Sequence, residues 1–469
     1  MDKAVIRTGI KNTVYVVLAQ SISLILGIAR TLILPILLGI TNFGYWQVYL
    51  LYMSYVGIFA LGFNDGIYLK YGKYEYNELP KEKLRSSIRL FIFFQLIIMI
   101  IISAIIAFEK DPAKKNAMFW ASVNIPIAGL TGVLTYIFQI TNQLKKYSFY
   151  TVLDKIVVLL IIVVLYIFKM DNFIIIVIAD TLTRVLVLVL MVVSCRDIIF
   201  GKGIEYQYAL NEVVENIRIG IKLMFANFSG MLVLGFGRFL LERTATVEEY
   251  GTYSFAMSTM NLVLVLITAI GLVIYPTLSR VNENVLSNFF NKMNDFLVVI
   301  IFGLLTILFP LKYFISSFMI NYIGIFKYLA IVFAIIFVQS KMQILINPYY
   351  KLLRKEDLML RANIVGVIMA VVFVTPLYFL TGSVRMVAIG TLLAMLIRLY
   401  LSEVYLRREL NILESKTIFL ELLGLLLFII LGSMSNIIIS LITYLLIYSV
   451  LVMKRSKKIK SMTKYLIRK

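Results

Sequence analysis

Long, uninterrupted apolar segments recur along almost the whole chain. The run after Leu160, for example, reads IIVVLYIF without a polar residue. Strands of a membrane barrel alternate apolar and polar residues, and these runs do not alternate. In lipid, the remaining way to satisfy every backbone hydrogen bond is the α-helix. The sequence therefore predicts an all-α polytopic membrane protein.

Composition supports this prediction. Of 469 residues, 61% are hydrophobic, and the mean hydropathy is +0.93, whereas a soluble domain is about 45–50% apolar. Because about 20 apolar residues cross a bilayer as a helix, fourteen spans are expected. The predicted spans are 13–38, 46–67, 88–108, 117–140, 151–169, 172–194, 216–241, 252–276, 293–310, 325–347, 358–380, 385–406, 416–432 and 434–453.

Turn-forming residues separate these spans. Gly39 follows the first span, Asp111-Pro112 the third and Thr381-Gly382-Ser383 the eleventh. The first span is too long for a signal peptide and lacks a small-residue cleavage site, so it is expected to stay in the membrane. The loops are short, and only the region 311–325 has an ambiguous assignment.

The distribution of positive charge predicts the orientation. The formal net charge is +21, which in a soluble protein would suggest a nucleic-acid partner. With the N-terminus placed inside, 33 basic residues fall in inside segments and 7 in outside loops. This bias follows the positive-inside rule. We therefore expect a multi-pass protein of the cytoplasmic membrane with both termini cytoplasmic and no nucleic-acid partner.

The chain lacks the residues that several kinds of chemistry require. The chain has no histidine and one cysteine, Cys195, so no disulfide, thiolate cluster or imidazole metal site is expected within it. No GxxxxGK[ST] loop is present to bind ATP phosphates. The sequence predicts no cofactor, no metal and no catalytic residue.

The two halves of the chain resemble each other. Leu26–Arg30 matches Leu234–Arg238 at an offset of 208 residues, and Phe43–Trp46 matches Tyr250–Tyr253 at 207. Since each half has six predicted helices, both repeats enter the membrane from the same side and are related by a pseudo-two-fold axis along the membrane normal. The predicted parts are a six-helix lobe over 1–200, a second over 201–410, and a helix pair with a basic tail over 411–469.

Several short motifs carry a family resemblance. They are Arg30 with Pro35, Leu38-Gly39 before Phe43-Gly44-Tyr45-Trp46, Leu61-Gly62-Phe63-Asn64-Asp65-Gly66, and Tyr275-Pro276 before Leu278-Ser279-Arg280. Together they resemble polysaccharide flippases of the multidrug/oligosaccharidyl-lipid/polysaccharide exporter superfamily. The resemblance implies alternating-access export of a polyprenyl-pyrophosphate-linked oligosaccharide to the outer leaflet, with membrane lipid around the protein. Coupling to a proton or sodium ion and a complex with a polysaccharide polymerase stay open.

Two relatives and one different class are alternatives. A lipid II-type flippase shares fourteen helices and a cationic cavity. A cation-coupled multidrug exporter commonly has twelve helices and a carboxylate in the first, where this chain has Arg30 and no acid. A membrane polysaccharide polymerase or ligase would need a large external loop and a general base, which this sequence does not offer.

Charged residues inside predicted spans are the candidate site residues, because each costs about 2.5–3.5 kcal/mol at the centre of the bilayer. The candidates for binding the anionic substrate are Arg30, Arg238, Arg184, Arg398 and Lys341. A guanidinium suits pyrophosphate because its fork of donors matches two oxygens. The alternative is that these residues only bridge helices or reach an interface.

Two carboxylates are candidates for ion coupling. They are Asp65, near the inner end of the second span, and Asp180 in the sixth. Asp180 and Arg184 are four residues apart, so they are also expected to pair along one helix face. A cap or salt bridge is the alternative role for Asp65.

Overall fold

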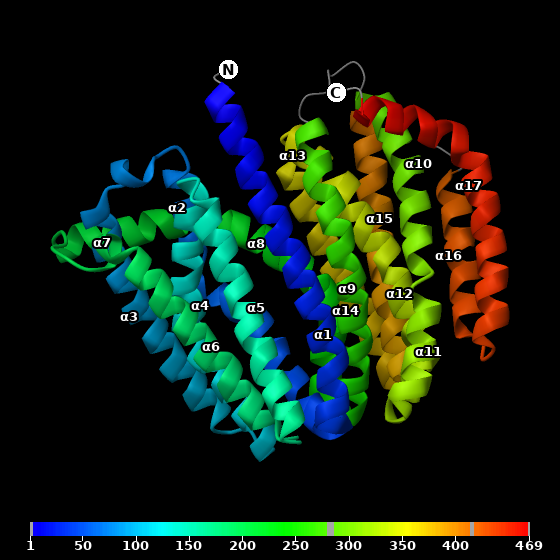
Figure 1. The fold of residues 1–469 in the computed structure, drawn as a ribbon, viewed down its shortest axis with the longest axis horizontal. Coiled ribbons are helices and arrows are strands. Elements are labelled where there is room, and N and C mark those ends of the chain that lie inside the picture. The colour runs from blue at the N-terminus through cyan, green and yellow to red at the C-terminus, as the bar shows by residue number, and fades with distance from the viewer. Residues whose placement is uncertain (1–2, 279–285, 413–416, 468–469) are drawn as a thin grey trace. The chain divides into compact units, whose positions relative to one another are not determined.

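A computed structural model describes residues 3–278, 286–412 and 417–467 (Figure 1), and every regular element in these ranges is helical, as predicted. The first elements are α1 (Lys3–Tyr55), η1 (Val56–Ala60), α2 (Phe63–Tyr71), η2 (Tyr76–Glu78), α3 (Lys81–Ile106), α4 (Pro112–Ile140), α5 (Leu144–Ile167), α6 (Phe173–Ser194) and α7 (Arg196–Ile199). The next are α8 (Tyr206–Thr244), α9 (Val247–Leu278), α10 (Leu286–Leu305), α11 (Leu308–Phe318), η4 (Ile320–Ile325) and α12 (Phe326–Lys341). The last are η5 (Met342–Ile346), α13 (Asn347–Leu352), α14 (Glu356–Thr381), α15 (Val384–Glu409), α16 (Thr417–Ser433) and α17 (Ile437–Ile467).

The helices agree with the predicted spans. Twelve stretches of described helix are long and apolar enough to cross a membrane, and a shorter apolar helix covers Ile418–Ser433. The stretch Leu18–Ala60 has 43 residues, about twice the length that one span needs. It contains the predicted break, because Gly39 has φ 67° and ψ 179°, which interrupts α1. Divided at this break, the stretch gives two apolar segments, so that with the shorter helix Ile418–Ser433 the described helices contain fourteen apolar segments, the number predicted as spans.

Other breaks have the local causes that the sequence indicated. The Asp111 carboxylate accepts hydrogen bonds from the backbone N–H groups of Ala113 (2.8 Å) and Lys114 (3.2 Å), and Pro112 begins α4. Gly382 ends α14 with φ 63°. The ambiguous region 311–325 is helical and belongs to α11 and η4. In the predicted motif after Pro276, Ser279 and Arg280 lie outside the described residues.

The chain divides into two compact units, called here unit 1 (Met1–Phe228) and unit 2 (Ser229–Lys469), and the division falls within α8. In unit 1, α1 packs against α4, α5 and α6. The predicted lobe boundaries at residues 200 and 410, and the axis relating the lobes, stay predictions.

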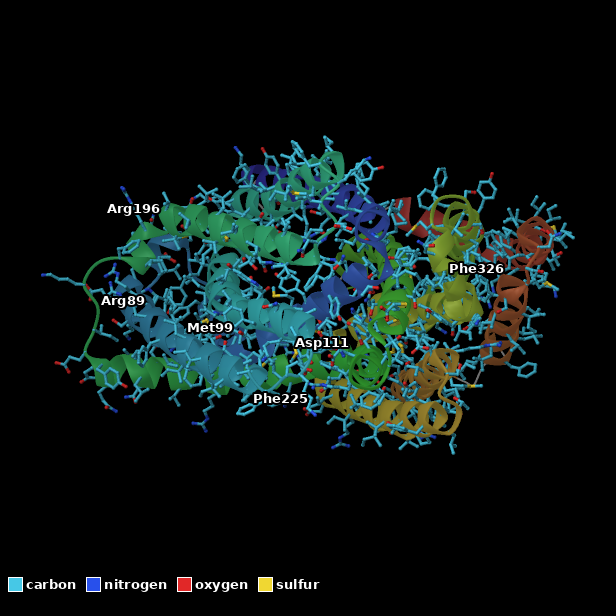
Figure 2. The ribbon with its side chains drawn as sticks, turned by 90° about the horizontal axis from the view of Figure 1, so that it is seen from below. Arg89, Met99, Asp111, Arg196, Phe225 and Phe326 are labelled. Atoms are coloured by element: carbon cyan, nitrogen blue, oxygen red, sulfur yellow. The ribbon has the colours of Figure 1, made fainter. Side chains whose placement is uncertain are left out.

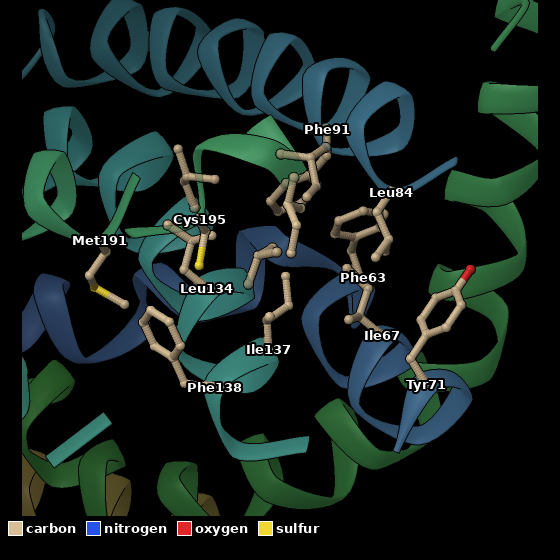
Figure 3. Close-up of a cluster of buried hydrophobic side chains, with 14 of the residues drawn as sticks. Phe63, Ile67, Tyr71, Leu84, Phe91, Leu134, Ile137, Phe138, Met191 and Cys195 are labelled. Atoms are coloured by element: carbon tan, nitrogen blue, oxygen red, sulfur yellow. The ribbon is translucent and has the colours of Figure 1, made fainter. Parts of the chain in front are cut away.

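An apolar cluster fills the space between α2, α3, α4 and α6 in unit 1 (Figure 3). Phe63 stacks on Phe91 with ring centroids 4.3 Å apart, and Leu134 is fully buried nearby. The start of α2 approaches α8 so closely that a Cβ at Gly66 would lie 1.9 Å from the Asn216 carbonyl oxygen. Only glycine fits there.

Arginines join α3 to the segment around α7, outside the candidate spans. Arg85 donates hydrogen bonds to the carbonyls of Asp197 (2.6 Å) and Lys202, and Arg89 donates to the carbonyl of Gly201 (2.9 Å). Arg89 and Arg196 mark this edge of unit 1 in Figure 2. The short α7 is thus fixed to α3 by side-chain donors.

Unit 2 is organised around α12, which is buried on most of its surface and packs against α9, α10, α15 and α16. The helices α16 and α17 lie side by side (Figure 1), and α17 also packs on α10. At the C-terminal end of α16, the Lys312 ammonium donates to the carbonyls of Gly432 (3.0 Å) and Met434 (2.8 Å). Carbonyls that the helix end leaves without an intrahelical donor are satisfied in this way.

Candidate functional site

Three charged residues meet in unit 1, each near the middle of its span. Arg184 Nε donates to Asp180 Oδ2 at 2.8 Å along α6, which confirms the predicted pair. Arg30 Nη1, on α1, lies 3.6 Å from Asp180 Oδ1. One carboxylate therefore serves two guanidinium groups.

Polar neighbours fix the orientation of the Asp180 carboxylate. Its side chain is only 1% exposed, and the Tyr49 hydroxyl donates to Oδ2 at 2.8 Å. Asn124 donates in turn to the Tyr49 hydroxyl oxygen (3.4 Å) and to Thr181 Oγ1 (3.0 Å). Because these groups come from three helices, the carboxylate is held by the packing of unit 1.

The two guanidinium groups are more accessible than their counterion. The side chains of Arg30 and Arg184 are 18% and 29% exposed. The Trp46 ring centroid lies 4.8 Å from Arg30 Cζ, within the range of a cation–π interaction. Both arginines therefore have exposed surface from which they can donate hydrogen bonds to a further group while they stay paired with Asp180.

A third cation, Lys155 on α5, belongs to this cluster. It forms an ion pair with Asp154 at 3.5 Å and interacts electrostatically with Arg30, Arg184 and Asp180. Sequence reasoning missed it by counting it with the cytoplasmic basic residues, although the predicted span 151–169 contained it. These three cations face two carboxylates, Asp154 and Asp180, so the unit 1 cluster has one excess positive charge.

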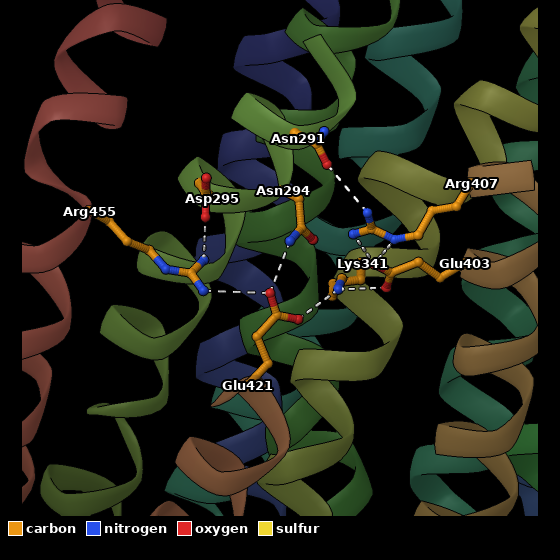
Figure 4. A network of polar contacts seen from close by, with 8 residues as sticks. All are labelled: Asn291, Asn294, Asp295, Lys341, Glu403, Arg407, Glu421 and Arg455. Atoms are coloured by element: carbon orange, nitrogen blue, oxygen red, sulfur yellow. Dashed lines mark hydrogen bonds and ion pairs between the residues drawn. The ribbon is translucent and has the colours of Figure 1, made fainter. Parts of the chain in front are cut away.

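Lys341 lies in a different kind of environment in unit 2 (Figure 4). Its ammonium donates to Glu403 Oε2 at 2.9 Å and to Glu421 Oε2 at 2.8 Å, and all three side chains are at most 3% exposed. Arg407 Nη2 also pairs with Glu403, at 2.7 Å. The Lys341 charge is therefore balanced inside the protein.

The same network extends to the C-terminal helix (Figure 4). Arg455 Nη1 lies 3.1 Å from Asp295 Oδ1, and its Nη2 lies 3.7 Å from Glu421 Oε1, which also accepts from Asn294 (2.9 Å). Three cations and three carboxylates make this unit 2 network neutral. Sequence reasoning missed it, although Glu403 and Glu421 stand inside predicted spans.

Arg238 contacts residues of the following helix. Its Nε donates to Ser254 Oγ at 3.4 Å and its Nη2 to the Tyr250 hydroxyl at 3.5 Å. The spacing of sixteen residues between Arg238 and Ser254 equals that between Arg30 and Trp46. In each sequence repeat, therefore, the arginine reaches the start of the next span.

The remaining candidates lie apart from these groups. Arg398, on α15, is 3% exposed. Asp65, on α2 and outside the candidate spans, accepts a hydrogen bond from the Tyr136 hydroxyl at 3.3 Å. Burial raises the pKa of the Asp65 carboxyl, and the Tyr136 hydrogen bond opposes this only in part. Within the described ranges, no three acidic or cysteine side chains are grouped to hold a metal ion.

A family assignment follows from the sequence. Residues 10–282, more than half of the chain, match the family described as polysaccharide biosynthesis protein. The chain belongs to the polysaccharide biosynthesis protein family. No curated protein matches the sequence.

Solved structures show which fold this member of the polysaccharide biosynthesis protein family has. It is similar to the lipid II flippase MurJ in an inward closed conformation, with a TM-score of 0.67 and 12% identity over 96% of this chain and 99% of that one. It is also similar to an outward-facing multidrug resistance MATE family transporter of the MOP superfamily, with a TM-score of 0.53 and 13% identity over 84% and 95% of the two chains. These likenesses confirm the predicted fold, which this chain shares with a lipid flippase and a multidrug transporter.

Proposed function

We propose that this protein is a flippase that moves a polyprenyl-pyrophosphate-linked oligosaccharide from the inner to the outer leaflet of the cytoplasmic membrane by alternating access, for cell-surface polysaccharide biosynthesis. The family and the transporter fold support a role in moving a polysaccharide precursor. The observation that carries the substrate assignment is the excess positive charge of the unit 1 cluster, near the middle of three spans.

The chemistry of the unit 1 cluster suits a pyrophosphate. Two guanidinium groups offer planar forks of donors for phosphate oxygens, and their charge is not lost by deprotonation. Asp180 orients both groups, so a bound pyrophosphate meets donors that are already in place. We assign Asp180 this counterion role rather than ion coupling, because both of its oxygens already face cations or a hydroxyl donor.

Lys341 has no place in this substrate assignment. Its charge is balanced by Glu403 and Glu421, and a balanced buried cation offers an anion little attraction. Arg238 stays in the assignment because it occupies the position that is equivalent to Arg30 in the sequence repeat. The polymerase partner and the cytoplasmic position of both termini remain predictions.

Asp65 is the better candidate for coupling to protons. Burial raises the pKa of its carboxyl, so protonation occurs closer to neutral pH than for an exposed aspartate. We expect Asp65→Asn to abolish the pH dependence of transport in proteoliposomes. Transport that needs sodium and does not respond to pH would contradict this assignment.

Surface polysaccharide measurements test the proposed function in cells. Arg30→Ala and Arg238→Ala, made singly, should lower surface polysaccharide at unchanged protein level. Arg385→Ala, which removes an exposed arginine at the start of α15, is the control and should leave it unchanged. Normal polymer in both test variants would remove these arginines from the mechanism. Loss of peptidoglycan precursor export instead would favour the lipid II-type alternative, and altered drug resistance the multidrug exporter.

A further inference from the structure

One membrane-spanning stretch of unit 2, Ile320–Leu352, is partly exposed along a narrow polar face. Between Tyr328 and Tyr350, all residues are buried except four, which are Gln339, Gln343, Asn347 and Pro348. Three of these four side chains carry an amide, and they are called here the amide stripe (Gln339, Gln343 and Asn347). The surface that the neighbouring helices leave uncovered on this span is therefore polar rather than apolar.

An irregular helical turn keeps the three amides close to one line. They are spaced four residues apart, and in an α-helix with 3.6 residues per turn each step of four moves the side chain further round the axis. The π-helical turn η5 contains Gln343 and ends just before Asn347. Because a π turn takes more residues to complete, four residues across it fall short of a full turn and offset the earlier drift. Turns of this kind inside α-helices are frequent at functional sites.

The amide stripe has unused hydrogen-bonding capacity. The side-chain oxygens of Gln339, Gln343 and Asn347 are buried and accept no hydrogen bond from any residue that the structure describes. Amides with a structural role in other spans have protein partners, since Gln95 donates to a backbone carbonyl at 2.6 Å and Asn294 donates to a carboxylate at 2.9 Å. An amide face turned to hydrocarbon would find no partner at all, which lipid penalises strongly. The stripe is therefore expected to face water or a polar ligand.

The chemistry of the amide stripe fits the hydroxyl groups of a sugar. Each amide offers two donors and one acceptor oxygen, so it can hydrogen-bond two neighbouring hydroxyls at once. The stripe carries no charge, and Lys341 beside it is already paired with Glu403 and Glu421, so nothing here selects an anion. At 1.5 Å per residue the stripe is about 12 Å long, which is enough to contact more than one sugar ring.

We propose that the amide stripe binds the glycan of the transported lipid through its hydroxyl groups. This inference rests on the proposed function and deepens it, because it assigns the two parts of the substrate to different residues. The unit 1 cluster binds the pyrophosphate, and the amide stripe binds the oligosaccharide. Hydrogen bonds between neutral groups have a small net strength, so a glycan that is held by them can also be released.

Binding of two lipids in nanodiscs of phosphatidylcholine tests the amide stripe. One probe is the lipid-linked oligosaccharide purified from the producing cells, and the other is polyprenyl pyrophosphate without sugar. Gln339→Met with Gln343→Met removes two amides at nearly constant side-chain size, so it should keep the melting temperature of wild type. It should weaken binding of the first probe at least tenfold and leave binding of the second unchanged. Gln339→Asn with Gln343→Asn, which keeps both amides, should bind the first probe more tightly than the methionine variant does.

A control and the contrary outcomes separate the amide stripe from the proposed function. Asn321→Met removes an exposed amide outside the stripe and should bind both probes like wild type. If the methionine variant binds the lipid-linked oligosaccharide as tightly as wild type, or loses both probes equally, the stripe does not recognise the glycan. The proposal is also overturned if sodium stabilises wild type but not this variant while glycan binding persists. If wild type binds a polyprenyl alcohol as tightly as polyprenyl pyrophosphate, the proposed function itself fails, whatever the stripe variants do.

Discussion

The unit 1 cluster and the unit 2 network contain the same number of cations but handle their charge differently. In the unit 1 cluster, Arg30, Arg184 and Lys155 face two carboxylates, and the arginines are 18% and 29% exposed. In the unit 2 network, three cations face three carboxylates, and Lys341 is 1% exposed. One region keeps an excess charge on partly exposed side chains, whereas the other is neutral and buried.

Position along the helices shows the same contrast. The unit 1 residues stand near the middle of α1, α5 and α6, where an unbalanced charge is most expensive. The unit 2 residues Glu403, Arg407 and Glu421 stand in the outer turns of α15 and α16. A buried neutral network of this kind joins α10, α12, α15, α16 and α17 and attaches the C-terminal helix pair to its unit. We therefore expect mutations to affect transport in unit 1 and stability in unit 2.

The largest effect is expected from removing a carboxylate in the unit 2 network. Glu421→Gln leaves Lys341 and Arg455 without a shared counterion in a closed environment, which should lower the free energy of unfolding by about 3–5 kcal/mol. Thermal unfolding in detergent measures this change. The control is Lys341→Met with Glu421→Leu, in which Glu403 keeps Arg407 and Arg455 keeps Asp295, and it should unfold close to wild type. If Glu421→Gln is as stable as wild type, the unit 2 network does not hold the C-terminal helix pair against the rest of unit 2.

The matched substitution in unit 1 should lower the free energy of unfolding by a smaller amount. Asp180→Asn removes the counterion of Arg30 and Arg184, but both arginines have accessible surface, so we expect a loss of about 1–3 kcal/mol, the range for an unsatisfied polar group. The same unfolding measurement applies. A loss as large as that of Glu421→Gln would contradict the view that the unit 1 cluster is the more open of the two.

Arginine substitutions sharpen the comparison further. Arg184→Ala should lower the transport rate at least tenfold, which corresponds to about 1.4 kcal/mol of binding or activation free energy, and should change stability little. Arg407→Ala should instead lower stability and leave transport per folded molecule unchanged. Flipping in proteoliposomes, normalised to folded protein, measures both. Equal transport defects in the two variants would remove the distinction between the regions.

The smallest effect is expected at an exposed ion pair of unit 1. Burial raises the pKa of Asp197, but hydrogen bonds from Lys81 and Tyr76 outweigh it, and the net pKa lies below the ordinary value of 3.8. Asp197 therefore contributes stability above its unfolded pKa and loses it as the pH falls through the lower, folded pKa. Because the pair is exposed to water, Asp197→Asn should cost less than about 1 kcal/mol at neutral pH. The melting-temperature difference from wild type should therefore shrink as the pH falls through the folded pKa of Asp197, and a difference that acid leaves unchanged would contradict the assignment.

Local features of the fold could be predicted from the sequence. The length of the apolar segments predicted the spans, and Gly39 and Gly382 predicted breaks between helices. Asp111-Pro112 predicted the start of α4. Each of these features depends only on residues that are neighbours in the sequence. The pairing of Asp180 with Arg184 was also predictable, since four residues make one helical turn.

Contacts between distant segments could not be predicted. Arg30 and Asp180 are 150 residues apart in the sequence, and nothing local indicates that one carboxylate serves two arginines. Lys341 was a candidate for substrate binding because it is a charge in a span, and its balance by Glu403 and Glu421 depends on how α12, α15 and α16 pack. Charge inside a span can be read from sequence, but whether that charge is compensated requires the tertiary structure.

Flipping of matched synthetic lipids by the reconstituted protein tests the central claim most directly. One lipid carries a fluorescent oligosaccharide through a pyrophosphate and the other carries it through a neutral linkage to the same polyprenyl chain. The account predicts that wild type flips the pyrophosphate lipid at least tenfold faster than the neutral one, and that Arg30→Ala with Arg184→Ala loses this preference. Equal rates for both lipids, or an unchanged preference in the double variant, would contradict it.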